Sequence, residues 1–210
     1  MSVSGFFMTV FVIGHLLGNL TIYSGPDGIN AYARLLHRFG AFLWAVRLTM
    51  GIMFLLHVFY GIQLTVENRA AKPQGYAVEG ILSSTFAGRN MIWTGLVIGT
   101  FIIYHLLHFT LQVTNPAFSA VGHPDAMGRP DVFMMVVFSF RIFYISLVYI
   151  AAMAALGLHL SHSTQSAVQT AGLNGERTFP VVAKGGTVAA ILIALGFAAF
   201  PITILAGILR

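Results

Sequence analysis

Long apolar runs alternate with short polar segments along this chain. Five of the runs reach the roughly 20 apolar residues that an α-helix needs to cross a bilayer; they cover about 3–23, 42–66, 91–113, 132–162 and 181–209. The segments between them carry the glycine, proline and asparagine residues that are typical of turns: 24–28, 68–89, 115–131 and 165–180. None of these segments is long enough for a soluble domain. The pattern predicts an all-α membrane protein with five transmembrane helices in one domain, residues 1–210.

Composition agrees with a chain that faces lipid. The sequence is 57% hydrophobic and only 8% charged, whereas a soluble domain is about 25% charged. It has no cysteine, which excludes disulfides, cysteine-ligated iron–sulfur clusters and thiol catalysis within the chain. The net charge of +5 is spread over loops and helix ends, which argues against nucleic-acid binding. The first run lacks a basic leader and a cleavage site, so we expect a retained helix and no signal peptide.

Loop charge gives an expected orientation. Positive-inside counting compares five basic residues after helices 2 and 4 with three in the opposite loops: Arg69, Lys72, Arg89, Arg177 and Lys184 against Arg34, Arg38 and Arg129. This places the N-terminus in the cytoplasm, for a multi-pass protein of the cytoplasmic (inner) membrane. Arg47 and Arg141 near the starts of helices 2 and 4 are expected to reach the outer interface with their long side chains.

Histidines are the candidate functional residues, because ionisable groups inside a membrane are rare and usually have a partner. His15, His57, His105 and His159 fall one per helix on the first four helices. Depths counted at about 1.5 Å per residue put two of them in the outer half of the membrane and two in the inner half. The expected pairs are His15 with His105 (outer) and His57 with His159 (inner).

Two facing neutral imidazoles suit a six-coordinate haem iron. Zinc would need more ligands per site, and no Cys, Asp or Glu lies within the apolar runs. Small residues beside the histidines would let a flat macrocycle approach the backbone: Gly14, Gly18, Gly61 and Gly157. The sequence therefore predicts a helix bundle around two stacked haems.

The other four histidines leave alternatives open. His108 and His162 each follow a proposed ligand by three residues on roughly the same helix face, so a shift of one turn would exchange the ligands. We interpret them as neighbours of the ligands, in contact with a haem propionate or a quinone, or as packing residues. His37 and His123 are expected to be solvated loop residues. Any single membrane histidine can also simply bond a backbone carbonyl.

Several motifs together resemble the dihaem cytochrome b subunit of succinate dehydrogenases and fumarate reductases. The similarity extends over nearly the whole chain and is specific only in combination. Its elements are His15-Leu-Leu-Gly-Asn19, Arg47 with His57-Val-Phe-Tyr-Gly61, Glu67-Asn-Arg-Ala-Ala-Lys-Pro73, Ser84–Met91 with Trp93-Thr-Gly95, His105-Leu-Leu-His-Phe109, His159-Leu-Ser-His-Ser-Thr-Gln-Ser166 and Gln169-Thr-Ala-Gly172.

This resemblance implies electron transport in a respiratory chain. It implies five membrane helices, two haems b with the same histidine pairs, and a quinone, commonly menaquinone. It also implies a flavoprotein with covalent FAD and an iron–sulfur protein on the cytoplasmic face, the flavin and the clusters lying outside this chain. The direction, succinate oxidation in the tricarboxylic acid cycle or fumarate reduction, stays open, as does the oligomeric state, a dimer of the complex included.

The sequence departs from the family pattern in two places. Gln165 stands where the third residue after the last histidine is commonly aromatic, and Ser163 where a glycine is common. No glutamate lies in helix 4 or in the first outer loop, which leaves proton coupling open.

Further site residues are suggested by charge and depth alone. Propionate partners are Arg34, Arg47 and Arg141 on the outer side, and Arg69 and Arg89 on the inner side. The sequence singles out no quinone site, and Asn19, Tyr23, Asp27 and His37 are named as outer-side candidates without a motif behind them. Two other functions remain: a dihaem anchor of a formate dehydrogenase, nitrate reductase or hydrogenase, and a non-redox transporter with histidines along a proton path.

Overall fold

The structure is a computed structural model that describes residues 1–71, 85–170, 172, 175 and 178–210. It is 83% helical, and the described part of the chain contains no strand. Five helices are long and apolar enough to cross a membrane, which confirms the predicted number of spans. They are α1 (Ser2–Asn19) continued by η1 (Leu20–Ser24), α3 (Ala41–Ala71), α5 (Met91–His105) continued by η2 (Leu106–Thr110), α7 (Phe143–Thr170) and α8 (Thr178–Leu205).

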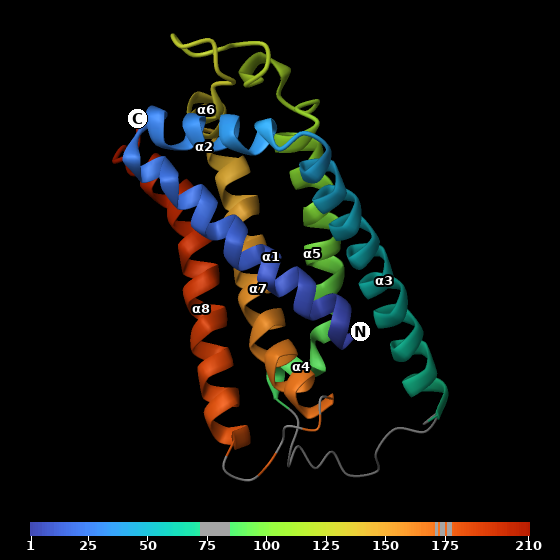
Figure 1. The fold of residues 1–210 in the computed structure, drawn as a ribbon. Coiled ribbons are helices and arrows are strands. Elements are labelled where there is room, and N and C mark those ends of the chain that lie inside the picture. The colour runs from blue at the N-terminus through green and yellow to red at the C-terminus, as the bar shows by residue number, and fades with distance from the viewer. Residues whose placement is uncertain (72–84, 171, 173–174, 176–177) are drawn as a thin grey trace.

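The helices form an elongated bundle (Figure 1). Helices α7 and α8 run side by side, α1 crosses in front of them, and α3 stands at the edge of the bundle. Helix α2 (Pro26–Arg38) lies across one end, and the short helix α4 (Phe86–Arg89) lies at the other. We call these the α2 end and the α4 end. The predictions for Lys72, Pro73, Ala171 and Arg177 concern positions outside the described residues.

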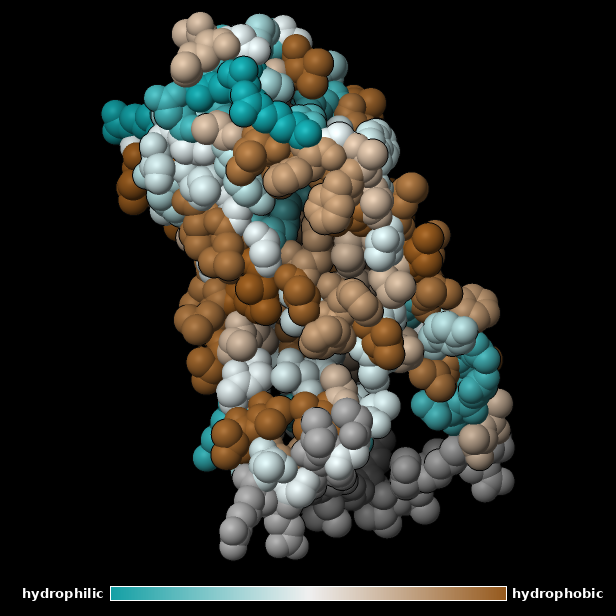
Figure 2. Space-filling view, viewed as in Figure 1, coloured by the Kyte–Doolittle hydropathy of each residue, from teal (hydrophilic) through white to brown (hydrophobic). Residues whose placement is uncertain are grey.

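Packing is dense between α7 and α8 and sparse around α3. Small residues let the two long helices approach, as where a Cβ on Gly157 would lie 3.1 Å from Cβ of Ala194. Aromatic and branched side chains fill the core at the α2 end: Phe133, Val137, Phe140, Ile145, Tyr149, Phe200 and Ile204. Helix α3, in contrast, has no buried residue. Figure 2 shows hydrophilic side chains gathered over the α2 end and hydrophobic ones along the body, as expected for a chain crossing a bilayer.

The prediction of one helix over 132–162 is wrong in detail. Helix α6 (Val132–Arg141) ends before Ile142, whose backbone is extended at φ −80° and ψ 109°. A new helix, α7, begins at Phe143 and continues to Thr170, so the first part of the segment predicted as loop 165–180 is helical. Ser146 stabilises the break, because its hydroxyl donates to the carbonyl of Phe140 at 2.6 Å.

The assignment of Arg34, His37 and Arg38 to a loop is also wrong, because all three lie on α2. Pro26 fits the first turn of this helix, where a missing N–H costs nothing. The apolar positions recur with helical spacing, and the buried residues Ile29 and Asn30 mark the face that packs on the bundle. Helix α2 is thus an amphipathic cap over the membrane helices.

Candidate functional site

His15 of α1 and His105 of α5 come together toward the α2 end of the bundle. Their ring centroids lie 5.9 Å apart with an interplanar angle of 86°. Nδ1 of His105 lies 3.4 Å from the hydroxyl of Tyr149. The side-chain amide of Asn19 donates to the carbonyl of His15 at 2.7 Å and lies 3.3 and 3.4 Å from its ring nitrogens. Both imidazoles are half-buried.

His57 of α3 and His159 of α7 form a second pair, nearer the α4 end. Their ring centroids lie 6.2 Å apart with an interplanar angle of 65°. Each Nδ1 lies near a hydroxyl on a neighbouring helix, 3.3 Å from Ser4 for His57 and 3.1 Å from Thr94 for His159. The structure therefore brings together the same two pairs that the depth argument expects.

The spacing of both pairs fits a metal centre held from two sides. A metal–imidazole bond of about 2 Å on each side puts facing ring centres about 6 Å apart. Within the described residues, no hydrogen bond reaches Nε2 of His57, His105 or His159, while Nδ1 has a hydroxyl neighbour in all three. Hydrogen bonding at one ring nitrogen fixes the tautomer and leaves the other free to bind metal. These three histidines would thus fit the role of haem ligands, whereas both ring nitrogens of His15 lie within 3.4 Å of the Asn19 amide.

The two pairs lie at different levels of the bundle. Tyr149 contacts His105, and His159 follows it by ten residues on the same helix, which corresponds to about 15 Å at 1.5 Å per residue. Ala152 and Met153 are buried between these levels, with Phe101 and Phe197 packed against them. An apolar layer therefore separates the two pairs.

His108 is a different kind of residue from His105. It is only 2% exposed, and both of its ring nitrogens are engaged. Nδ1 lies 2.9 Å from the hydroxyl of Tyr149 and Nε2 lies 3.1 Å from the hydroxyl of Ser139. The π-helical turn η2 widens the helix at this point. The arrangement makes His108 a packing residue and a neighbour of His105, and leaves it no nitrogen for a metal.

His162 of α7 contacts the start of α4. Its Nδ1 lies 3.5 Å from the hydroxyl of Thr85 at the start of α4. A Cβ on Gly88 would lie 2.9 Å from Cε1 of His162, so glycine at this position admits the ring. His37 and His123 contact carbonyls four residues back in their own segments, Ala33 and Ser119.

The glycines expected near a cofactor have different surroundings. A Cβ on Gly18 would clash with the Tyr32 ring of α2, so this glycine serves the packing of the cap. A Cβ on Gly61 would lie 3.7 Å from the thioether of Met1, and one on Gly14 would meet nothing within 4 Å. The glycines that lie against imidazoles were not predicted: a Cβ on Gly5 or Gly95 would lie 3.3 Å from His57 or 3.4 Å from His159, respectively.

Two of the arginines expected near propionates lie over aromatic rings. The guanidinium of Arg47 is 5.1 Å from the Trp44 ring centre, and that of Arg141 is 5.4 Å from Phe138. Arg34 lines a pocket of about 190 Å³ on α2 with Arg38 and Arg129. These positions agree with a basic surface at the α2 end, and none of these contacts involves a paired histidine.

The four outer candidates for quinone binding each contact other residues. Asn19 bonds His15, Tyr23 lies 3.2 Å from the hydroxyl of Thr203, and His37 contacts its own helix. Asp27 accepts from Arg129 at 2.6 Å. In the described part of the chain, no hydrogen bond or ion pair joins any two of the four.

The sequence did not predict which residues contact the imidazoles from other helices. Ser4, Thr94 and Tyr149 come from other helices, and a lone hydroxyl in an apolar run carries no signal of its own. Asn19 could have been found, because it lies four residues after His15 on one helix face.

Among the described residues, no group of three or more His, Cys, Asp or Glu side chains could hold a metal ion. Comparison of the chain with protein-family models, with curated proteins and with solved structures gave no match.

Proposed function

We propose that this chain is the dihaem cytochrome b subunit that anchors a succinate:quinone oxidoreductase in the membrane. It would pass electrons between an iron–sulfur partner and a membrane quinone. The observation that carries the proposal is the two facing imidazole pairs, 5.9 and 6.2 Å apart, at two levels of one bundle. The succinate or fumarate class rests on the sequence motifs around these histidines.

The chain's own residues hold and orient the metal ligands. The paired histidines would hold the metal through a ring nitrogen, and an imidazole must be neutral to bind iron. The hydroxyls of Ser4, Thr94 and Tyr149 set the ring orientations through Nδ1. A haem held by these histidines would supply one-electron transfer.

Partner subunits would bind this chain at one end of the helix bundle. The iron–sulfur and flavin subunits would dock at the α4 end, on the cytoplasmic face of the inner membrane, which is where loop charge places that end. Affinity purification of the chain from native membranes should recover a protein with covalently bound flavin and an iron–sulfur protein. Recovery of the chain alone under mild detergent would contradict this part.

Haem counting tests the core of the proposal. The purified chain should contain two haems b by pyridine haemochrome, with a reduced-minus-oxidised difference spectrum of the b type. His57→Ala and His15→Ala should each remove one haem and leave the other, because each pair binds separately. His123→Ala changes an exposed loop histidine and is the matched control that should keep both. Absence of haem would favour the transporter alternative, and a His57→Ala protein with both haems would refute the pairing.

A further inference from the structure

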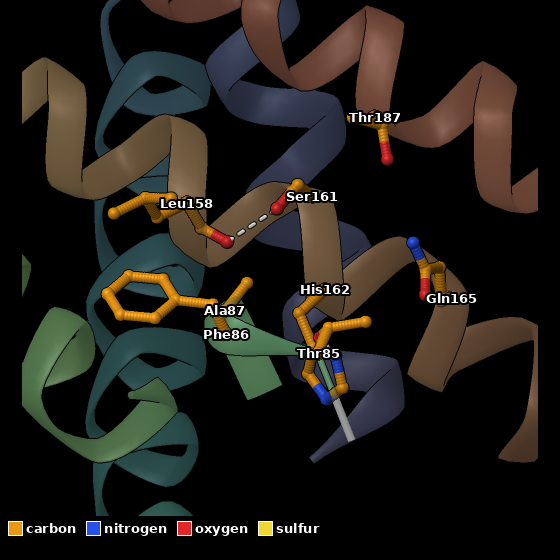
Figure 3. A pocket seen from close by; sticks show the side chains of 8 residues that line it. All are labelled: Thr85, Phe86, Ala87, Leu158, Ser161, His162, Gln165 and Thr187. Atoms are coloured by element: carbon orange, nitrogen blue, oxygen red, sulfur yellow. Dashed lines mark hydrogen bonds between the residues drawn. The ribbon is translucent and has the colours of Figure 1, made fainter. Parts of the chain in front are cut away.

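A pocket of about 280 Å³ lies at the α4 end, between three helices. Figure 3 shows its walls, which come from the start of α4, one face of α7 and one turn of α8. The lining side chains are Thr85, Phe86, Ala87, Leu158, Ser161, His162, Gln165 and Thr187. Because α7 contributes Leu158, Ser161 and Gln165 at helical spacing, this face differs from the one that directs His159 toward Thr94 of α5.

Polar groups in the pocket are arranged as hydrogen-bond donors. The Thr85 hydroxyl oxygen accepts from the Gly88 N–H at 3.0 Å and lies 3.5 Å from Nδ1 of His162. In the tautomer in which Nδ1 accepts the Thr85 proton, His162 carries its own proton on Nε2, as a donor. The side-chain amide of Gln165 makes no hydrogen bond within the described residues and offers two further donor protons.

Hydroxyls in the pocket supply acceptors. Ser161 donates its proton to the carbonyl of Leu158 at 2.8 Å, and Thr187 donates to Ala183 at 2.9 Å. Their oxygens keep lone pairs free for a ligand. Apolar contact comes from the Phe86 ring and the Leu158 side chain, which are 62% and 41% exposed.

The lining carries no formal charge. None of its eight residues is Lys, Arg, Asp or Glu, so the described lining itself supplies no fixed charge to pair with a carboxylate or a phosphate. A neutral ring with carbonyl oxygens matches donors from two sides and an aromatic contact. The apolar surroundings on α7 and α8 suit a ligand that enters from lipid.

We propose that this pocket at the α4 end binds the head group of a membrane quinone, with His162 and Gln165 donating to its ring carbonyls. The proposal rests on the proposed function, because it names where the chain meets a quinone. It places that site near the level of His57 and His159 and away from Asn19, Tyr23, Asp27 and His37, the positions that charge and depth suggested.

Photolabelling locates the bound ring. The purified full chain in lipid nanodiscs is irradiated with an azido-substituted 1,4-naphthoquinone, digested and mapped by mass spectrometry. The label should fall on peptides containing residues 85–87 or 158–165, and excess 2-methyl-1,4-naphthoquinone should suppress it. Labelling confined to the α2 end, or no labelling of haem-containing protein, would overturn the proposal.

Variants test the two donors. Gln165→Leu and His162→Phe should each raise the naphthoquinone concentration for half-maximal labelling about tenfold, as for one lost hydrogen bond. Gln169→Leu makes the same change one turn further along α7, outside the lining, and should leave labelling unchanged. Equal labelling of all three variants and the unaltered chain would contradict the assigned roles.

Haem content measured on the same samples separates the two proposals. Both haems should remain in the two donor variants, because neither residue belongs to a histidine pair. Haem-containing protein labelled elsewhere refutes the pocket and spares the proposed function. Haem-free protein labelled in the pocket refutes the proposed function and supports the site.

Discussion

Tyr149 joins the two histidines of the α5 segment through one hydroxyl. If Nε2 of His105 is to bind iron, its Nδ1–H donates to the Tyr149 oxygen at 3.4 Å. The Tyr149 proton then goes to Nδ1 of His108 at 2.9 Å, and Nε2–H of His108 donates to Ser139 at 3.1 Å. Each donor in this series of hydrogen bonds has one acceptor. The network therefore assigns one direction to all its protons and one role to each histidine.

Tyr149→Phe removes that shared hydroxyl and keeps the ring. We expect haem affinity at the His15/His105 pair to fall about 10- to 100-fold, which is typical when a group that orients a metal ligand is lost. The buried Nδ1 of His108 also loses its partner, at a cost of about 1–3 kcal/mol in unfolding free energy. Haem titration of haem-depleted protein, followed by its absorption spectrum, measures the first effect.

Tyr104→Phe is the matched control for this change. Tyr104 belongs to the same aromatic cluster, and its ring centroid lies 6.0 Å from that of Tyr149. Its hydroxyl makes no hydrogen bond in the described part of the chain. It should bind both haems like the unaltered protein. Unchanged affinity at both pairs in Tyr149→Phe would show that the tyrosine does not orient His105.

At this scale the sequence predicts which histidines lie in pairs, but it does not predict the hydroxyl residues beside them. His15, His57, His105 and His159 stand out because imidazoles are rare in apolar runs, and counting residues along straight helices sorts them by depth. Ser4 and Thr94 escape that reasoning, since their contacts with His57 and His159 depend on how different helices cross. The π-helical turn that holds His108 depends on packing in the same way.

Helix α2 is held over the bundle by a polar cluster on the loop before α6. Arg129 is buried and donates to Asp27 on α2 at 2.6 Å and to Asp125 at 2.7 Å. Asn30 is fully buried; its amide donates to Asp125 and Asp131, and its oxygen accepts from the Phe133 N–H at 2.9 Å. This cluster fixes both the cap and the first turn of α6.

Asn30→Leu is expected to destabilise the cap. Leucine fills a similar volume but leaves the buried Phe133 N–H without its acceptor, and each such group costs about 1–3 kcal/mol. Thermal unfolding in detergent, followed by circular dichroism, should show a lower midpoint than for the unaltered chain. Asn68→Leu, on the exposed face of α3, should be neutral. A similar midpoint for both variants would mean that α2 is not held by Asn30.

The same cluster predicts a stability change at acid pH. Burial raises the pKa of Asp125, but hydrogen bonds from the backbone and side chain of Arg129, from Met127 N–H and from Asn30 outweigh burial and lower it to about 2. Because the folded pKa lies below the usual value of 3.8, the stabilisation is complete above about pH 4 and is lost as the pH falls toward about 2.

Asp125→Asn provides the comparison that isolates this effect. Its unfolding midpoint should lie below that of the unaltered chain by a constant amount from neutral pH down to about pH 5. The gap should close between about pH 4 and 2, where the carboxylate of the unaltered chain takes up a proton. A gap that persists unchanged at the lowest pH would show that the Asp125 charge is not the cause.

Helices could be predicted from the sequence where length and apolarity alone identify them. Length and apolarity identify the five spans, and their number is confirmed. Helix α2 was not predicted because it has only 13 residues and mixes apolar with polar positions, so it forms no long apolar run. The break between α6 and α7 was not predicted because Ile142 is apolar and carries no turn signal. Buried hydrogen bonds made by Ser139 and Ser146 stabilise that break instead.

On the scale of the whole molecule, α3 is held differently from the other spans. No residue of α3 is buried. In α7 and in α8, by contrast, 33% of the residues in an 18-residue apolar stretch of the helix are buried. The main described contacts of α3 are with α1 and α5, and His57 reaches across to His159 on α7. A flat group ligated by both histidines would therefore tie α3 to the rest of the bundle.

Ligand binding should then stabilise the whole chain. A group present at about 100 times its Kd adds about 2.7 kcal/mol to the unfolding free energy. Haem-loaded protein should therefore unfold at a higher midpoint than haem-depleted protein, and His57→Ala should lose part of this increase. Equal midpoints for loaded and depleted protein would argue against haem as a structural component.

The absence of native cysteine allows the position of α3 to be measured with paired spin labels. The labels would be attached through Leu55→Cys on α3 and Leu192→Cys on α8. The native leucines at these positions are 67% and 62% exposed. The distance distribution of the labels by pulsed electron paramagnetic resonance should be narrow in loaded protein and broader after haem depletion, because α3 loses its cross-link through His57. Val148→Cys with Leu195→Cys, on the tightly packed α7 and α8, should give the same width in both states. If the α3 pair also kept its width, α3 would be held by its contacts with α1 and α5 alone, and the facing histidines would have no part in joining the bundle.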